Sequence, residues 1–334
     1  MADTPGLDLL DGARRFFVTG GAGFIGSHLV EALLRLPQAE VVVYDNFSSG
    51  RRWHLETIPA GVPLTVVERD LKDLDRLVAA MTGADAVFHL ASNPDIAKAE
   101  TEPAIDFWEG TYLTQNVLEA MRRNRVRWIV YASGSGVYGD RGDTELAEDA
   151  GPFLPISTYG ASKLAGEALI GAYCHMFELS GRAFRFANVV GPRQTHGVVY
   201  DFVRRLLAEP THLQILGDGS QSKSYIHVDD IVQAMLTVGR RGSGGFDAFN
   251  VATLDYQSVR EIADLVIDRL RLSDVRYEFT GGARGWKGDV PVVRFDTAKI
   301  RALGWVSRYS SREALLHAAD AIIAHARGGT LEHA

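Results

Sequence analysis

The stretch TGGAGFIG, at residues 19–26, decides the fold of this chain. It follows a short apolar run at 14–19 and opens a segment, 27–36, whose leucines recur at helical spacing. One glycine permits the tight turn from a strand into a helix, and a second lets the backbone approach a pyrophosphate. The phosphate charge then meets the free N–H groups and the positive end of the helix. The loop therefore predicts a dinucleotide-binding strand–turn–helix unit.

An acidic residue stands at the distance from this loop that such a site requires. Asp45 ends the next β-branched run, 40–44, and follows the last glycine by about 20 residues. A carboxylate there accepts hydrogen bonds from the adenosine ribose, and it repels a 2′-phosphate, which favours NAD over NADP. Arg51 and Arg52 follow closely, and we interpret them as solvated loop cations and not as a clamp for such a phosphate. Asp70, after the third expected strand, is placed to reach the adenine edge or to cap the next helix.

The rest of the first half repeats the alternation of strand and helix. Such a pattern is typical of buried parallel strands joined by right-handed crossovers. The expected strands are 40–44, 64–68, 86–90 and 128–132, and the expected helices are 71–82, 103–124 and 158–178. Past residue 187 glycine turns become frequent. We expect an α/β fold: a Rossmann-type doubly wound parallel sheet over 1–187, to which 225–252 returns, and a smaller, interleaved α/β substrate lobe over 188–334.

The composition is that of an ordinary globular protein. Of the 334 residues, 46% are hydrophobic and 23% are charged, which disfavours disorder and coiled coils. Acidic residues outnumber basic ones by 42 to 35, and the net charge of −7 disfavours nucleic acid as a partner. The single cysteine, Cys174, permits no intrachain disulfide, and no His or Cys spacing indicates a metal site. Because no apolar run of about 18 residues and no leader-like N-terminus is present, we expect a cytoplasmic protein without a membrane partner.

A tyrosine and a lysine stand four residues apart in the stretch STYGASKLAGEAL. On a helix this spacing places Tyr159 and Lys163 on one face. A nearby ammonium favours the tyrosinate, so the phenol can act as a base near neutral pH. In a chain that also carries a dinucleotide loop, the pair predicts proton transfer beside a nicotinamide and not an ordinary surface contact.

Several short stretches, in order along the chain, give it a family resemblance. They are TGGAGFIG (19–26), YDNFSSG (44–50), RDL (69–71), FHLAS (88–92), YGASK (159–163), RFANVVGP (185–192) and YIHVDD (225–230). Over most of its length the chain resembles the extended short-chain dehydrogenase/reductase family, and in particular its nucleotide-sugar epimerases and dehydratases.

The resemblance implies a role for each matching residue. Tyr159 would be the catalytic base, and Lys163 would hold the nicotinamide ribose and tune the tyrosine. Further cofactor-binding residues for NAD would be Gly20, Gly23, Phe24, Ile25, Gly26, Asp45, Asn46, Ser48, Gly50, Asp70, Leu71, Leu90, Ala91, Ser92 and Phe186. The residues expected to bind a nucleotide-sugar substrate are Ser133, Ser135, Asn188, Gln214, Lys223, Arg284 and Asp289. The resemblance also implies a homodimer formed through 103–124 and 158–178.

The loop ASGSGVYG, at 132–139, departs from the family pattern. The family usually has Ser or Thr at the position of Gly134, so Ser133, Ser135 or an ordered water would have to bind the sugar O4, with Ser135 as the third catalytic residue. The related dehydratases carry an Asp-Glu pair where Ser135 and Gly136 stand, and the related decarboxylases often carry Glu at the second position. A reaction that needs only hydride and one proton therefore fits best. The glycines also leave room for a C5 carboxylate.

A second departure concerns the phosphate-binding charge. The loop at 280–291 resembles the family's Arg-x-Gly-Asp segment, but Trp286 occupies the arginine position. Arg284, Lys287 or Lys223 would then supply the charge. We expect an NAD-dependent C4 epimerase of a UDP-hexose or a UDP-uronic acid. The alternatives are dehydration, decarboxylation or net oxidoreduction of a nucleotide sugar, and an NAD-binding protein without catalysis.

Overall fold

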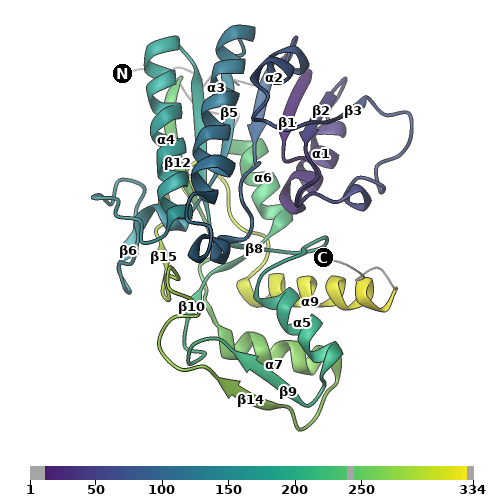
Figure 1. The fold of residues 1–334 in the computed structure, drawn as a ribbon, viewed down its shortest axis with the longest axis vertical. Coiled ribbons are helices and arrows are strands. Elements are labelled where there is room, and N and C mark those ends of the chain that lie inside the picture. The colour runs from purple at the N-terminus through teal and green to yellow at the C-terminus, as the bar shows by residue number, and fades with distance from the viewer. Residues whose placement is uncertain (1–11, 239–243, 329–334) are drawn as a thin grey trace. The chain divides into compact units, whose positions relative to one another are not determined.

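The computed structural model describes residues 12–238 and 244–328, and the chain folds as two compact units (Figure 1). Unit 1 comprises the described residues up to Val137, together with Ser157–Arg185 and the described part of Val232–Phe249. Unit 2 comprises Tyr138–Ile156, Phe186–Ile231 and the described residues from Asn250 onward. Each unit is therefore assembled from separate stretches of the chain.

Unit 1 is built on a seven-stranded sheet. Its strands are β1 (Arg15–Thr19), β2 (Glu40–Asp45), β3 (Leu64–Glu68), β4 (Ala86–His89), β5 (Trp128–Gly134), β7 (Ser180–Phe186) and β12 (Gly245–Val251), in the order β12-β7-β5-β4-β1-β2-β3. Strand β1 pairs in parallel with both β2 and β4, and the parallel pairs β2–β3 and β4–β5 continue outward on its two sides. This doubly wound arrangement confirms the expected Rossmann-type fold class.

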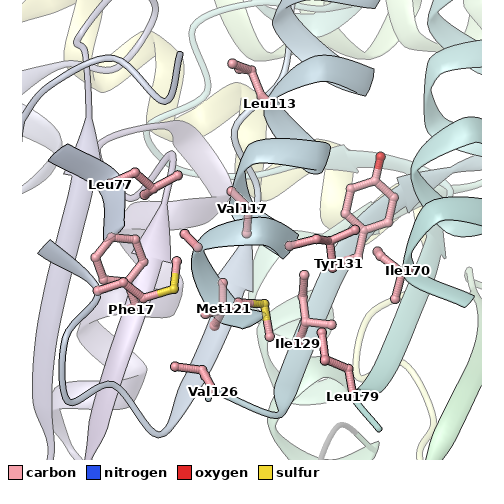
Figure 2. Packing of buried hydrophobic residues seen from close by; sticks show 14 of the residues in the cluster. Phe17, Leu77, Leu113, Val117, Met121, Val126, Ile129, Tyr131, Ile170 and Leu179 are labelled. Carbon is pink, nitrogen blue, oxygen red and sulfur yellow. The ribbon is translucent and has the colours of Figure 1, made fainter. Parts of the chain in front are cut away.

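The helices of unit 1 bury apolar faces against this sheet. They are α1 (Phe24–Leu34), α2 (Leu74–Ala80), α3 (Tyr112–Asn124), α4 (Thr158–Phe177) and α6 (Val228–Val238), of which α6 begins in unit 2. Helices α2, α3 and α4 contribute to one core together with alternate residues of the strands. Figure 2 shows the side chains that meet there: Phe17, Ile129 and Tyr131 from the strands, and Leu77, Val117, Met121 and Ile170 from the helices.

The helix expected at 103–124 is not uniform in the structure. A 3₁₀ turn lies at Ile96–Glu100 and a π-helical turn at Phe107–Thr111, and only then does α3 begin. Gly110 explains the close approach at this point, because a Cβ there would lie 2.2 Å from the Ser162 hydroxyl of α4. The wider π turn and this contact bring the segment before α3 close to the first turns of α4, which matters for the site.

Unit 2 has its own core around three helices. Helices α5 (Val198–Ala208), α7 (Val259–Leu270) and α9 (Ser311–Arg327) pack against one another, and Ser258 and Ser310 open α7 and α9 with capping boxes. The short helix α8 (Ala298–Ala302) and four strand pairs complete the unit. The pairs are β8 (Asn188–Val190) with β11 (Tyr225–His227), β9 (His212–Ile215) with β14 (Arg276–Phe279), β6 (Glu145–Leu146) with β15 (Arg294–Phe295), and β10 (Ser222–Lys223) with β13 (Gln257–Ser258). Of the helices in the described ranges, none has the length and apolarity needed to cross a membrane.

Candidate active site

The glycine loop of unit 1 is held by backbone contacts that exclude larger residues. Gly20 has a φ of +70°, and a Cβ there would lie 2.7 Å from the Ala91 nitrogen. A Cβ on Gly26 would lie 2.1 Å from the carbonyl oxygen of Gly20, which also accepts a hydrogen bond of 3.1 Å from the Gly23 N–H. Helix α1 begins at Phe24, with Gly23 as its N-cap. The loop therefore presents backbone N–H groups at a helix N-terminus, where a pyrophosphate fits.

Asp45, at the end of β2, is fixed beside this loop. Its carboxylate accepts hydrogen bonds from the Ala22 N–H at 2.9 Å and the Phe47 N–H at 2.8 Å. Burial raises the pKa of Asp45, and the two N–H bonds act in the opposite direction. Arg52 forms an ion pair of 2.6 Å with Glu68. An acid at the ribose position fits NAD better than NADP.

Several other residues that were expected to bind the cofactor also come together. Asn46 Oδ1 accepts a bond of 3.0 Å from the Ser48 N–H, and Asn46 Nδ2 donates to Asp70 Oδ2 at 3.3 Å. Asp70 does not cap the next helix, because the N-cap of α2 is Asp73. Leu71 is buried, and the Leu90 N–H bonds the Thr19 carbonyl at 3.2 Å, so both flank the same end of the sheet.

Lys163 is buried on α4 and is held by two oxygen atoms. Its Nζ donates to the Ala132 carbonyl at 2.8 Å and to the Ser92 hydroxyl at 3.2 Å. The Nζ also lies 5.4 Å from the centre of the Tyr159 ring, so the structure confirms that the two side chains share one region. Burial lowers the pKa of Lys163 to about 8. The ammonium is thus oriented, and its charge is sensitive to nearby acids.

Tyr159 stands in the first turn of α4, which Ser157 caps through a bond from the Gly160 N–H. Burial first, and the negative charge of Asp106 second, raise the pKa of Tyr159 to about 12. From the sequence, the ammonium of Lys163 is expected to lower the pKa of Tyr159. In the structure, burial and Asp106 act in the opposite direction, so the phenol of the chain alone is protonated at neutral pH.

Ser133 and Ser135 have different environments. The Ser133 hydroxyl donates to Glu167 Oε1 at 2.6 Å, and Arg185 binds both oxygens of that carboxylate at 3.0 and 2.7 Å. Ser133 is 4% exposed, so its hydroxyl hydrogen is directed to an internal partner. Ser135 is half-buried and opens a 3₁₀ turn, Ser135–Tyr138. Of the two, Ser135 has the placement that suits a substrate contact.

The two glycines of this loop serve different purposes. A Cβ on Gly134 would meet nothing within 4 Å, so this position leaves open space. A Cβ on Gly136 would lie 3.1 Å from the Gly160 Cα of α4. The expectation that both glycines enlarge the pocket therefore applies to Gly134, whereas Gly136 allows two backbones to pack closely.

We expect the two positions to differ in their tolerance of a methyl group. Gly136→Ala should lower the free energy of unfolding by about 1–3 kcal/mol, because backbone must shift to accept the Cβ. Gly134→Ala should stay within about 0.5 kcal/mol of the parent chain and serves as the matched control. Urea unfolding of the three proteins checks this. Equal midpoints for the two variants would contradict the close-packing role of Gly136.

In unit 2, three of the expected substrate residues form one cluster. Asp289 is bonded by Lys223 Nζ at 2.6 Å through its carboxylate and by Arg284 Nη1 at 2.5 Å through its carbonyl. Arg284 also forms an ion pair of 2.5 Å with Asp140. Asn188, on β8, hydrogen-bonds Tyr225 through its side chain, and the charge of Asp289 also acts on Tyr225.

Gln214, expected to bind substrate, and Phe186, expected to bind the cofactor, have surroundings that do not indicate a role. Gln214 is exposed on β9, where its carbonyl accepts a bond from Arg205 at 3.1 Å. Phe186 is buried at the end of β7.

Two acids beside the tyrosine–lysine pair were missed in the sequence. Glu167 follows Lys163 by one helical turn, so helix periodicity could have placed it on the same face. Asp106 carries no such signal, because its position depends on the π-helical turn Phe107–Thr111. Both act on the pKa of Lys163, and each raises it.

Comparison with known proteins identifies the family. The model of the NAD dependent epimerase/dehydratase family matches residues 16–252. The chain belongs to this family. A UDP-glucose 4-epimerase of Mycolicibacterium smegmatis is 34% identical over 308 residues, which make up 90% of this chain and 96% of that protein.

Solved structures of this family cover nearly the whole chain. A UDP-galactose 4-epimerase matches with a TM-score of 0.84 and 39% identity, covering 93% of this chain and 99% of that one. A dTDP-glucose 4,6-dehydratase from Streptomyces venezuelae with NAD bound matches with a TM-score of 0.85 and 28% identity, covering 94% and 98% of the two chains. Relatives of both reaction types therefore share this fold.

The protein is an enzyme of the NAD-dependent nucleotide-sugar epimerase/dehydratase family, and its cofactor is NAD. The residues of unit 1 fit this cofactor. Gly20, Gly23 and Gly26 leave the loop free of side chains, and Asp45 presents a carboxylate at the end of β2. Lys163 and Tyr159 belong to the same unit and lie on α4.

Proposed function

We propose that this enzyme inverts C4 of a nucleotide-diphosphate sugar, either a UDP-hexose or a UDP-uronic acid, through a 4-keto intermediate. Unit 1 would carry the cofactor and the reacting side chains, and unit 2 would bind the nucleotide part of the substrate. The cluster of Lys223, Arg284 and Asp289 supports the second assignment, because it joins two cations and an acid in one place. We place Asn188 and Gln214 with this cluster as further substrate residues.

The observation that carries the proposal is that the acids around Tyr159 are already engaged in internal hydrogen bonds. The carboxylates of unit 1 that act on Tyr159 or Lys163 are Asp106 and Glu167. They are 1% and 4% exposed, and both are engaged in hydrogen bonds. The neighbouring loop has Ser135 and Gly136 where an acid pair would serve elimination. Elimination of water needs a second acid, whereas C4 inversion needs one proton-transfer group.

Tyr159 supplies that group in this proposal. Its phenol accepts the proton of the sugar 4-hydroxyl and later returns it. Lys163, fixed by Ala132 and Ser92, holds the nicotinamide ribose and stabilises the tyrosinate by its positive charge. Ser135 contacts the sugar near O4, and the open space at Gly134 accommodates its C5 substituent. NAD would be held by the glycine loop, Asp45 and Lys163, and it would supply a hydride acceptor and donor for C4.

A panel of substrates tests the proposal. The purified enzyme is incubated with UDP-, GDP-, CDP- and dTDP-sugars and with the corresponding uronic acids, and the products are read by NMR. We expect at least one pair of C4 epimers to reach equilibrium without consumption of added NAD. Turnover that consumes NAD in proportion to product would contradict epimerisation and indicate a net dehydrogenase.

Dehydration is the second candidate, because a 4,6-dehydratase matches the chain with a TM-score of 0.85. A dehydratase releases water from the sugar, so mass spectrometry separates its product from an epimer of unchanged mass. Loss of water from any sugar of the panel would favour this candidate over C4 inversion.

We further propose that the enzyme forms a homodimer through α3 and α4, as the family resemblance implies. Large apolar side chains are exposed on and just before these helices: Phe107, Trp108, Met176 and Phe177. A second copy of the chain would remove them from water.

A further inference from the structure

A buried carboxylate links three elements around the first turn of α4. Asp106, just before the π-helical turn Phe107–Thr111, is 1% exposed. Its Oδ2 accepts a hydrogen bond of 2.7 Å from the hydroxyl of Thr158, which directly precedes Tyr159. Its Oδ1 accepts a bond of 3.0 Å from the side-chain amide of Asn93, in the loop after β4. Asp106 therefore ties the chain after β4 and the segment before α3 to the start of α4.

We propose that Asp106 is a positioning residue of the Tyr159–Lys163 pair, which fixes Thr158 by a hydrogen bond and sets the protonation of the pair by its charge. Because each oxygen of the carboxylate has an internal donor, Asp106 acts through the pair and not on the substrate. The inference depends on the proposed function only in taking Tyr159 as the base.

The charges around the pair explain why Asp106 stands out. Four titratable side chains from the surrounding elements interact with the Tyr159–Lys163 pair. They are His89 of β4, Tyr131 of β5, Glu167 of α4 and Asp106. Burial lowers the pKa of His89 to about 3 and raises the pKa of Tyr131, so both are neutral at pH 7. Glu167 is balanced by its ion pair with Arg185. Among the described residues, Asp106 is thus the acid beside the pair that no such cation balances.

The direction of the effect follows from the sign of this charge. A carboxylate disfavours the tyrosinate and favours the ammonium, so it raises the pKa of Tyr159 and of Lys163. Removing the charge should lower both pKa values. Both limbs of the activity profile, which report the titration of this pair, should then move to lower pH.

Asp106→Asn removes the charge with little change of shape. The amide oxygen can still accept from Asn93, and the amide N–H₂ can donate to the Thr158 hydroxyl, which rotates to accept. Thr158→Val is the matched control, because it breaks the hydrogen bond and keeps the carboxylate. Geometry and charge are thereby separated.

The experiment measures two quantities on the NAD-loaded enzyme. The first is the pH profile of kcat/KM. The second is the titration of Tyr159 by tyrosinate absorbance, taken as the difference from the same protein carrying Tyr159→Phe, and it needs no substrate. For Asp106→Asn we expect both limbs and the titration midpoint to fall by about one pH unit. For Thr158→Val we expect the midpoints of the parent enzyme.

Each outcome bears on the proposal. Unshifted midpoints in Asp106→Asn, with or without a loss of rate, would overturn it, because a purely structural residue alters rate and not protonation. If this variant does not fold, Asp106→Ser replaces it, because serine keeps a hydroxyl and removes the charge. The same fall of the midpoints is expected for Asp106→Ser. If no sugar turns over, the absorbance titration alone decides about Asp106, so failure of the proposed function is distinguishable.

Discussion

Tyr159→Phe should lower kcat by about 10²–10⁴-fold, the contribution expected of a positioned proton-transfer group. The substitution removes the one oxygen that is proposed to take the sugar 4-hydroxyl proton, and it leaves the aromatic ring in place. The surroundings of the ring stay intact, since Lys163 is anchored by Ala132 and Ser92 and not by the phenol. NAD content of the purified variant should therefore equal that of the parent enzyme.

Tyr173→Phe is the matched control for this substitution. Tyr173 lies on the same helix, and its hydroxyl bonds Gln115 at 2.6 Å, at a distance from the proposed site. Initial rates with the best sugar of the panel, together with the NAD released on denaturation, are compared for the three proteins. Parent-like turnover in Tyr159→Phe would remove Tyr159 from the mechanism, whatever the control shows.

Gly26→Ala should cause the largest loss of cofactor. The added Cβ would lie 2.1 Å from the Gly20 carbonyl oxygen and 2.8 Å from the Gly21 Cα, so the loop must open. Opening displaces the N–H groups that face the pyrophosphate. Overpacking costs about 1–3 kcal/mol. If the whole cost falls on the NAD-bound form, the affinity for NAD drops roughly 5- to 150-fold.

Gly171→Ala provides the control for a methyl group added to a helix. Gly171 lies within α4, and a Cβ there would make an ordinary contact of 3.7 Å with the ring of Phe246. NAD retained through gel filtration, and NAD rebinding followed by calorimetry, measure the effect. Retention of NAD by Gly26→Ala at the level of Gly171→Ala would show that the close contact in the loop is not required.

Much of unit 1 could be predicted from the sequence because its signals are local. The glycine loop, the β-branched runs and the Tyr159–Lys163 spacing each follow from neighbouring residues, and the strands β1 to β5 lie where these patterns indicate. The parallel pairing of these strands was expected from their buried apolar character and from the helices between them. Asp45 was found for the same reason, since its distance from the loop is set by one helix and one strand.

The details that were missed depend on contacts between distant segments. The π-helical turn before α3 resembles an ordinary helix in sequence, yet it brings Asp106 to the start of α4. The direction of the Ser133 hydroxyl is set by Glu167 and Arg185, which come from a helix and another strand. Gly136 looked like free space, but the Gly160 backbone fills it. Contacts between residues so far apart in the sequence leave no periodic pattern, so they can be seen only in the folded structure.

The position of C4 hydrogen in the product tests the central claim most directly. The enzyme is incubated in deuterated water with the nucleotide sugar that it turns over, and the product is examined by NMR. C4 inversion predicts an epimer that carries no deuterium on carbon, because the hydrogen leaves and returns without meeting solvent. A product that has lost water and carries deuterium at C5 would contradict the account and identify a dehydratase.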